Sequence, residues 1–115
     1  MSNNLDKSIS IITVLMLYCH KLGSTTSYVV MDLQPDMSHY KIRAPIAYVE
    51  PDELERLRHY LNQPRDRMIE ESYWMLGSRS DGTEQLRLLG MMVDEAEVTF
   101  ENSELYICVR RVNRA

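Results

Sequence analysis

The sequence has few of the residues that hold small proteins together by covalent or metal bonds. Its 115 residues include two cysteines, Cys19 and Cys108, and three histidines, with no Cys-x-x-Cys or His-x₃-His spacing. A single disulfide would not form a framework in a domain of this size. Free cysteine packs like a small hydrophobe, so we expect both thiols to be reduced and buried. The sequence therefore predicts no metal, no cofactor and a reducing, cytoplasmic location.

Catalytic motifs are also lacking. No Gly-x-Ser-x-Gly elbow occurs, and the stretch LGSRSDG does not have the spacing of a phosphate-binding glycine loop. Acidic residues are abundant, but general acid–base chemistry needs carboxylates that converge in a cleft. Acidic clusters along a chain are more typical of solvated faces and helix caps. The sequence therefore predicts that the protein is not an enzyme, and an enzyme or small-ligand domain with an unrecognised site is the alternative.

An excess of positive charge is missing as well. The net charge is −4, whereas nucleic-acid affinity comes mainly from Lys and Arg side chains that neutralise phosphates. The densest basic segment is the C-terminal RRVNRA, which contains Arg110, Arg111 and Arg114. Three arginines at a chain end are more typical of a solvated end than of a binding site. Direct nucleic-acid binding is therefore not expected, and a nucleic-acid-binding regulator that uses this end is the third interpretation.

The longest uncharged stretch runs from Ser8 to Cys19 and is bounded by charged residues. A membrane span needs about 20 predominantly apolar residues, so this stretch is too short. Its β-branched residues favour a strand, but its length disfavours one. Asp6 or Ser8 before it and Gly23 after it are typical helix caps, so we expect a buried core helix. Two neighbouring apolar stripes would cover it, Leu5, Ile9, Ile12, Met16 and Cys19, and Ile11, Leu15, Tyr18 and Leu22.

The rest of the chain combines strand patterns with two helix patterns. Strands are predicted over residues 27–34, 40–50, 83–93, 96–100 and 105–112. Helices are predicted from Pro51 and from Pro64, the second reaching about Leu76, with a β-hairpin around Asp81-Gly82 as the competing interpretation. The order α-β-β-α-α-β-β-β predicts one α+β domain over residues 1–115. It would contain a mostly antiparallel sheet of about five strands, a buried N-terminal helix and two middle helices.

Aromatic and acidic side chains concentrate in the predicted helical region 50–76. Tyr73 and Trp74 lie beside Glu70 and Glu71, and Trp74 is the one tryptophan of the chain. Large aromatic residues anchor many protein interfaces, and charged residues at the rim steer the approach of a partner. We therefore predict that these four residues bind a partner. The alternative is that Trp74 closes the domain's own core.

These absences and this aromatic cluster favour a small acidic, non-catalytic protein-interaction module. Bacterial or phage inhibitors, immunity-type proteins and accessory or regulatory proteins are of this kind. The expected partner is a protein, and an acidic surface would suit a basic one such as a nucleic-acid-handling enzyme. A homodimer is compatible with the sequence, and no membrane binding is expected.

Overall fold

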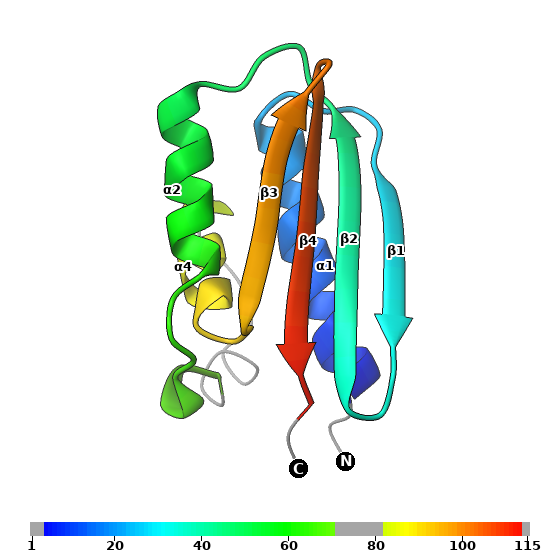
Figure 1. Cartoon of the computed structure of the whole chain (residues 1–115), viewed down its shortest axis with the longest axis vertical. Helices are drawn as coiled ribbons and strands as arrows, with labels where there is room; N and C mark the ends of the chain where they lie inside the picture. Colours follow the sequence, from blue (N-terminus) through cyan, green and yellow to red (C-terminus); the bar gives the residue numbers. More distant parts are fainter. Residues whose placement is uncertain (1–3, 71–81, 114–115) are drawn as a thin grey trace.

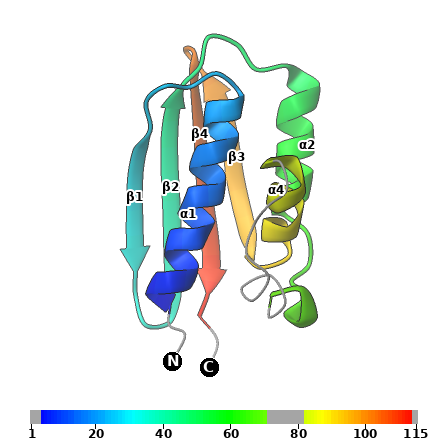
Figure 2. The ribbon, with the colours of Figure 1, turned by 180° about the vertical axis from the view of Figure 1, so that it is seen from behind.

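The computed structural model describes residues 4–70 and 82–113 (Figure 1). Within these residues, four strands form one antiparallel sheet in the order β1-β2-β4-β3. The elements are α1 (Asn4–Lys21), β1 (Tyr28–Leu33), β2 (Met37–Pro45), α2 (Pro51–Leu61), α4 (Gly82–Gly90), β3 (Glu95–Glu101) and β4 (Glu104–Val112). Helix α1 lies against one face of the sheet, α2 packs against β3, and α4 packs against α1 and α2 (Figures 1 and 2). The predicted α+β class, antiparallel sheet and N-terminal helix are confirmed.

The prediction of about five strands is wrong, because residues 82–90 form helix α4 instead of a strand. The strand prediction relied on the alternation of Leu86 and Leu88 with polar neighbours. The structure instead buries Leu86 and Leu89, three residues apart, and leaves Leu88 half-buried. Residues three apart share one face of a helix, whereas they point to opposite faces of a strand. A short leucine-rich window fits both periods, and packing against α1 and α2 selects the helix.

The second middle helix begins later than the sequence predicts. Pro64 precedes it, and the described helical turn covers residues 67–70. The Asp66 carboxylate caps this turn by accepting hydrogen bonds from the backbone N–H groups of Met68 and Ile69, at 3.0 and 3.2 Å. Residues 71–81, including the predicted helix end at Leu76, lie outside the described residues.

Helix α1 is confirmed as a core helix, but only one of its sides is buried. The buried residues are Ser8, Ile11, Ile12, Val14, Leu15, Tyr18 and Cys19. The apolar residues that stay exposed are Leu5, Ile9, Met16 and Leu17. The predicted stripe from Leu5 to Cys19 is therefore only partly buried, and α1 runs obliquely over the sheet in contact with β2 and β1 (Figure 2). None of the helices in the described part of the chain has the length and hydropathy of a membrane span.

A buried polar pair fixes the start of α1 over the sheet. The Ser8 Oγ and Tyr40 Oη atoms lie 2.8 Å apart, and both residues are fully buried. Each hydroxyl satisfies the other, so neither carries the cost of an unpaired buried polar group. Tyr40 belongs to β2, and its ring joins Ile42 of β2 and Ile107 of β4 in the core beneath α1.

The predicted C-terminal hairpin is confirmed, and its turn requires two consecutive residues with positive φ angles. Asn102 and Ser103 connect β3 to β4 with positive φ angles of 52° and 59°. Two consecutive left-handed residues are the geometry of a type I′ turn, whose twist matches that of the flanking strands. Asparagine tolerates this conformation well, whereas serine does so at a steric cost.

Replacing Ser103 by glycine is expected to raise the free energy of unfolding by about 0.5 kcal/mol. Glycine would remove left-handed strain of about 1–2 kcal/mol, and its greater freedom in the unfolded chain would offset about 0.5–1 kcal/mol. Chemical denaturation measures the difference. Ser27→Gly is the control, because Ser27 has no positive φ, so only the entropic loss applies there. A Ser103→Gly variant no more stable than wild type would contradict the strain at this turn.

Candidate protein-interaction surface

Exposed apolar side chains gather at one margin of the sheet. In the described residues, ten large apolar side chains are exposed, and eight of them belong to α1 or β1. We define the β1 surface as Leu5, Ile9, Met16, Tyr28, Val29, Val30 and Met31. Single exposed apolar residues are normal, but a group of them on adjacent elements marks a site of interaction.

Strand β1 contributes to both faces of this margin. Val29 and Met31 lie opposite buried residues of β2, so they share the face of the sheet that α1 covers. Tyr28 and Val30 alternate with them and point to the other face. Every residue from 28 to 32 is exposed. The strand is therefore a mostly apolar, exposed edge that α1 contacts on one face without burying it.

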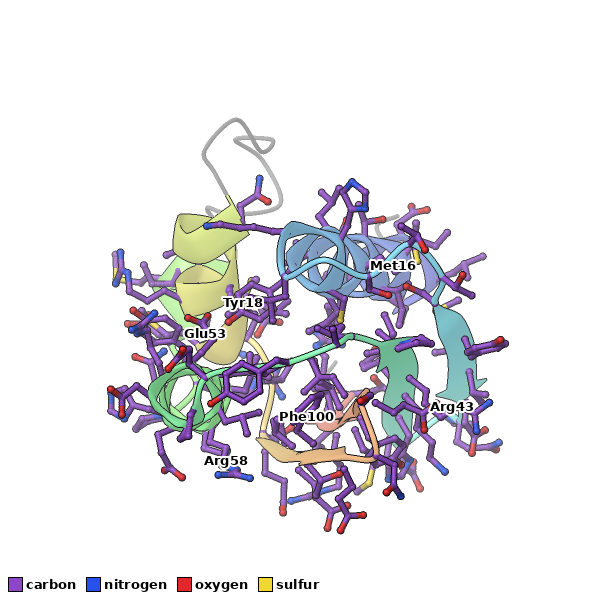
Figure 3. All side chains as sticks on the ribbon, turned by 90° about the horizontal axis from the view of Figure 1, so that it is seen from above. Met16, Tyr18, Arg43, Glu53, Arg58 and Phe100 are labelled. Carbon is purple, nitrogen blue, oxygen red and sulfur yellow. The ribbon has the colours of Figure 1, made fainter. Side chains whose placement is uncertain are left out.

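Helix α1 extends the apolar area on the helix-covered face. Met16 lies on the side of α1 nearer β1, whereas Tyr18 points the other way, toward Glu53 of α2 (Figure 3). Ile9 and Leu5 lie seven and eleven residues before Met16, which puts them on nearly the same side of the helix. The exposed row on α1 therefore runs alongside Val29 and Met31.

The free edge of β1 presents a defined set of backbone groups. Its turn into β2 closes with a hydrogen bond from the Gln34 N–H to the Met37 carbonyl, at 3.1 Å. Antiparallel pairs alternate between hydrogen-bonded and non-hydrogen-bonded, so Tyr28, Val30 and Asp32 direct their backbone groups to β2. Residues 29, 31 and 33 direct theirs outward, to an edge that no described strand occupies.

The opposite edge of the sheet, at β3, is covered by side chains of α2 and of Asn62, the residue that follows it. Arg58 donates hydrogen bonds from Nε and Nη2 to the Val98 carbonyl, at 3.1 and 2.9 Å. Asn62 donates from Nδ2 to the Ala96 carbonyl at 3.2 Å and accepts at Oδ1 from the Ala96 N–H at 2.9 Å. These side chains take the place of a neighbouring strand, a common protection of sheet edges. The described residues provide no such cover for β1.

Charge is unevenly distributed over the sheet face that points away from α1. Four carboxylates lie on the β3–β4 hairpin, at Glu95, Glu97, Glu101 and Glu104, whereas β1 contributes only Asp32 to this face, and Lys41 and Arg43 lie next to it on β2, with Arg43 paired to Glu104 at 3.5 Å. The Arg43 guanidinium carbon lies 4.8 Å from the centre of the Tyr28 ring, a cation–π geometry. The surroundings of β1 are therefore less acidic than the net charge suggests.

Of the four residues predicted to bind a partner, the structure describes Glu70. Its carboxylate accepts hydrogen bonds from Arg65 Nη2 and Arg111 Nη2, each at 2.8 Å. Burial alone would raise the pKa of Glu70, but these two guanidinium groups outweigh it and hold the pKa below its usual value. Glu70 therefore has an internal partner. Glu71, Tyr73 and Trp74 lie outside the described residues.

The sequence predicts that the arginines near the C-terminus are solvated, but Arg111 is buried and Arg110 is paired. Arg111 is only 2% exposed, and its Nε also donates to the Met92 carbonyl at 3.2 Å. Arg110 forms an ion pair with Glu95 on the neighbouring strand. Alternation along β4 explains the difference, because Arg111 shares the inward face with Val109, whereas Arg110 faces outward. Arg114 lies outside the described residues.

The groups capable of chemistry do not converge in the described part of the chain. Cys19 is fully buried, and burial raises the pKa of its thiol to about 12, so it is a poor nucleophile. Cys108 is only partly buried, unlike the prediction for both thiols, and both cysteines are free. The Tyr18 hydroxyl donates to the Glu53 carboxylate, and burial together with this contact raises the pKa of Tyr18. Among residues 4–70 and 82–113, no three His, Cys, Asp or Glu side chains group as metal ligands would.

Sequence reasoning placed the partner site on the middle helices and missed the β1 surface. A signal for it was present in the consecutive apolar residues Val29, Val30 and Met31, because a strand with one solvated face alternates apolar and polar residues. The sequence matches no protein-family model, and no characterised protein is significantly similar to it.

Proposed function

We propose that this protein is a small non-catalytic interaction module that binds a protein partner through the β1 surface. The observation that supports this most is the contrast between the two edges of the sheet. One edge is closed by Arg58 and Asn62, whereas the other combines outward backbone groups with exposed apolar side chains. Sheet edges of this second kind accept a further strand, and the exposed side chains then add apolar contacts.

The predicted anchors on the middle helices are a second proposed contact region. Glu70 contributes less to a rim than the sequence predicts, because Arg65 and Arg111 already engage its carboxylate. Trp74→Ala tests the anchor role, provided that binding and a thermal melt are measured on the same variant. Loss of binding with an unchanged melt would support an anchor, and a collapsed melt would return Trp74 to the core.

The main experiment captures partners on the immobilised full chain from a lysate of its natural host. Val30→Lys is expected to abolish capture, because a lysine would replace an apolar contact at the centre of the β1 edge. Leu17→Lys is the matched control, because Leu17 is similarly exposed, 51% against 56% for Val30, and lies outside the β1 surface. Proteins retained equally by both variants would contradict binding through this surface.

A further inference from the structure

We propose that the β1 surface binds a second copy of this chain, with the two β1 strands antiparallel across a two-fold axis at Val30. This proposal rests on the proposed function, because it names the partner of the same surface. The two four-stranded sheets would join into one continuous sheet of eight strands. Symmetric pairing of one patch with itself is the commonest arrangement in homo-oligomers.

The outward backbone groups of β1 fit this pairing. With the axis at Val30, Val29 of one copy lies opposite Met31 of the second copy. Both residues direct their N–H and C=O groups to the free edge, so each such pair exchanges two hydrogen bonds. Val30 then forms the non-hydrogen-bonded pair at the axis, which agrees with its own backbone groups facing β2. The backbone alternation therefore permits this register.

The side chains of β1 are complementary to themselves in the same register. Val30 meets Val30, and Val29 meets Met31, so the centre of the junction is apolar on both faces of the sheet. Tyr28 meets Asp32 of the second copy. Because the Arg43 guanidinium lies over the Tyr28 ring, that carboxylate approaches a positive group. Opposite-charge and apolar pairs across strands are the ones that stabilise a sheet.

The exposed row on α1 would also be covered. A two-fold axis perpendicular to the sheet keeps both α1 helices on the same face, one on each side of the joined β1 strands. Met16 lies on the side of α1 that faces this junction (Figure 3), and the helical spacing puts the exposed Leu5 and Ile9 on nearly the same side. The dimer would thereby bury apolar residues of α1 as well as those of β1.

Charge favours a second copy despite the net charge of −4. The acidic cluster of the outer face lies on β3 and β4, and β3 is the strand farthest from β1 in the sheet. Pairing at β1 therefore places the two acidic clusters at the far ends of the dimer, where salt screens their repulsion. The residues nearest the junction include Lys41, opposite Val30, and Arg43, which pairs with Glu104, so Lys41 offsets Asp32 there.

Two measurements test the proposal on the full chain. Light scattering after size exclusion should give twice the chain mass of 13.5 kDa for the wild type and for Leu17→Lys. Val30→Lys should give a folded monomer, because two lysines would meet at the axis while the exposed Val30 side chain contributes little to the single chain. Circular dichroism checks that each variant is folded.

Crosslinking tests the register itself. Across a non-hydrogen-bonded antiparallel pair the Cα atoms lie about 4.5 Å apart, within the range that a disulfide bridges. In a Cys108→Ser background, Val30→Cys should form a covalent dimer with oxidised glutathione as the oxidant. Asp32→Cys is the matched control on the same face, because the axis at Val30 separates its two copies by about 13 Å along the strands.

Each outcome decides for or against the second copy. A dimer that Val30→Lys dissociates and Val30→Cys crosslinks supports it. A monomer at all concentrations overturns it, as does a dimer that survives Val30→Lys. The lysate capture separates the two proposals. If the wild type captures a protein other than a second copy of this chain, and Val30→Lys does not, the proposed function stands and the homodimer is overturned. If the wild type is monomeric and Val30→Lys captures the same proteins as the wild type, both the proposed function and the homodimer are overturned.

Discussion

Replacing Glu70 by glutamine is expected to lower the free energy of unfolding by about 3 kcal/mol at neutral pH. Glutamine keeps the size of the side chain but removes the charge that faces Arg65 and Arg111. Arg111 is almost fully buried, so its guanidinium would lose its main counter-charge. Removing one partner of a buried ion pair costs about 3–5 kcal/mol, and we expect the lower value because Arg111 keeps its bond to the Met92 carbonyl.

The same substitution should change how stability depends on acid. Burial would raise the pKa of Glu70, but the hydrogen bonds and charges of Arg65 and Arg111 lower it below the usual 4.5. A group with a lowered pKa in the folded state stabilises the fold above its unfolded pKa, and this contribution is lost as the pH falls through the folded pKa. Denaturation curves should therefore show the gap between wild type and Glu70→Gln narrowing below about pH 4.5.

Glu55→Gln is the matched control for this prediction. Glu55 also pairs with an arginine, Arg58, but its side chain is 73% exposed. Exposed pairs of this spacing contribute about 0.3–0.5 kcal/mol, so this variant should melt almost like the wild type. Equal losses for the two substitutions would contradict an internal ion-pair cluster at Glu70.

Replacing Gly90 by alanine is expected to destabilise the domain by about 3 kcal/mol, the upper part of the usual range for overpacking. A Cβ atom at Gly90 would lie 1.5 Å from the backbone oxygen of Tyr60 and 2.6 Å from its carbonyl carbon. The obstacle is backbone, so no side-chain rotation relieves it, and α4 would have to move away from the end of α2. Thermal and chemical denaturation of the variant measure the loss.

Whether Gly90→Ala lowers or raises the free energy of unfolding shows whether packing or helix propensity dominates at this position. Alanine in a helix is normally about 1 kcal/mol more favourable than glycine, so propensity alone predicts a more stable variant. Gly23→Ala provides a comparison, because nothing lies within 4 Å of its Cβ position and only its positive φ of 112° opposes the change. A Gly90→Ala variant at least as stable as the wild type would contradict the close approach of α4 to α2.

Local patterns identified most elements because their signals lie within a few residues. The capped apolar run predicts α1, Pro51 and the following leucine stripe predict α2, and the alternation in 96–112 predicts the C-terminal hairpin. Residues 82–90 were misassigned because Leu86, Leu88 and Leu89 fit a strand and a helix equally over so short a window. The buried pair Leu86 and Leu89 becomes evident only once α4 packs on α1 and α2.

The sequence by itself determined the acidic composition, the α+β class and the antiparallel pairing of neighbouring strands, because these depend on residue types and short-range periodicity. Tertiary structure decided which sheet edge is closed and which stays open. The hydrogen bond from Arg58 to Val98 joins residues 40 apart in the sequence, and the one from Arg111 to Glu70 joins residues 41 apart. No local sequence pattern encodes contacts of this range. The order β1-β2-β4-β3 leaves β1 at a margin, and it thereby turns an ordinary apolar strand into a candidate binding surface.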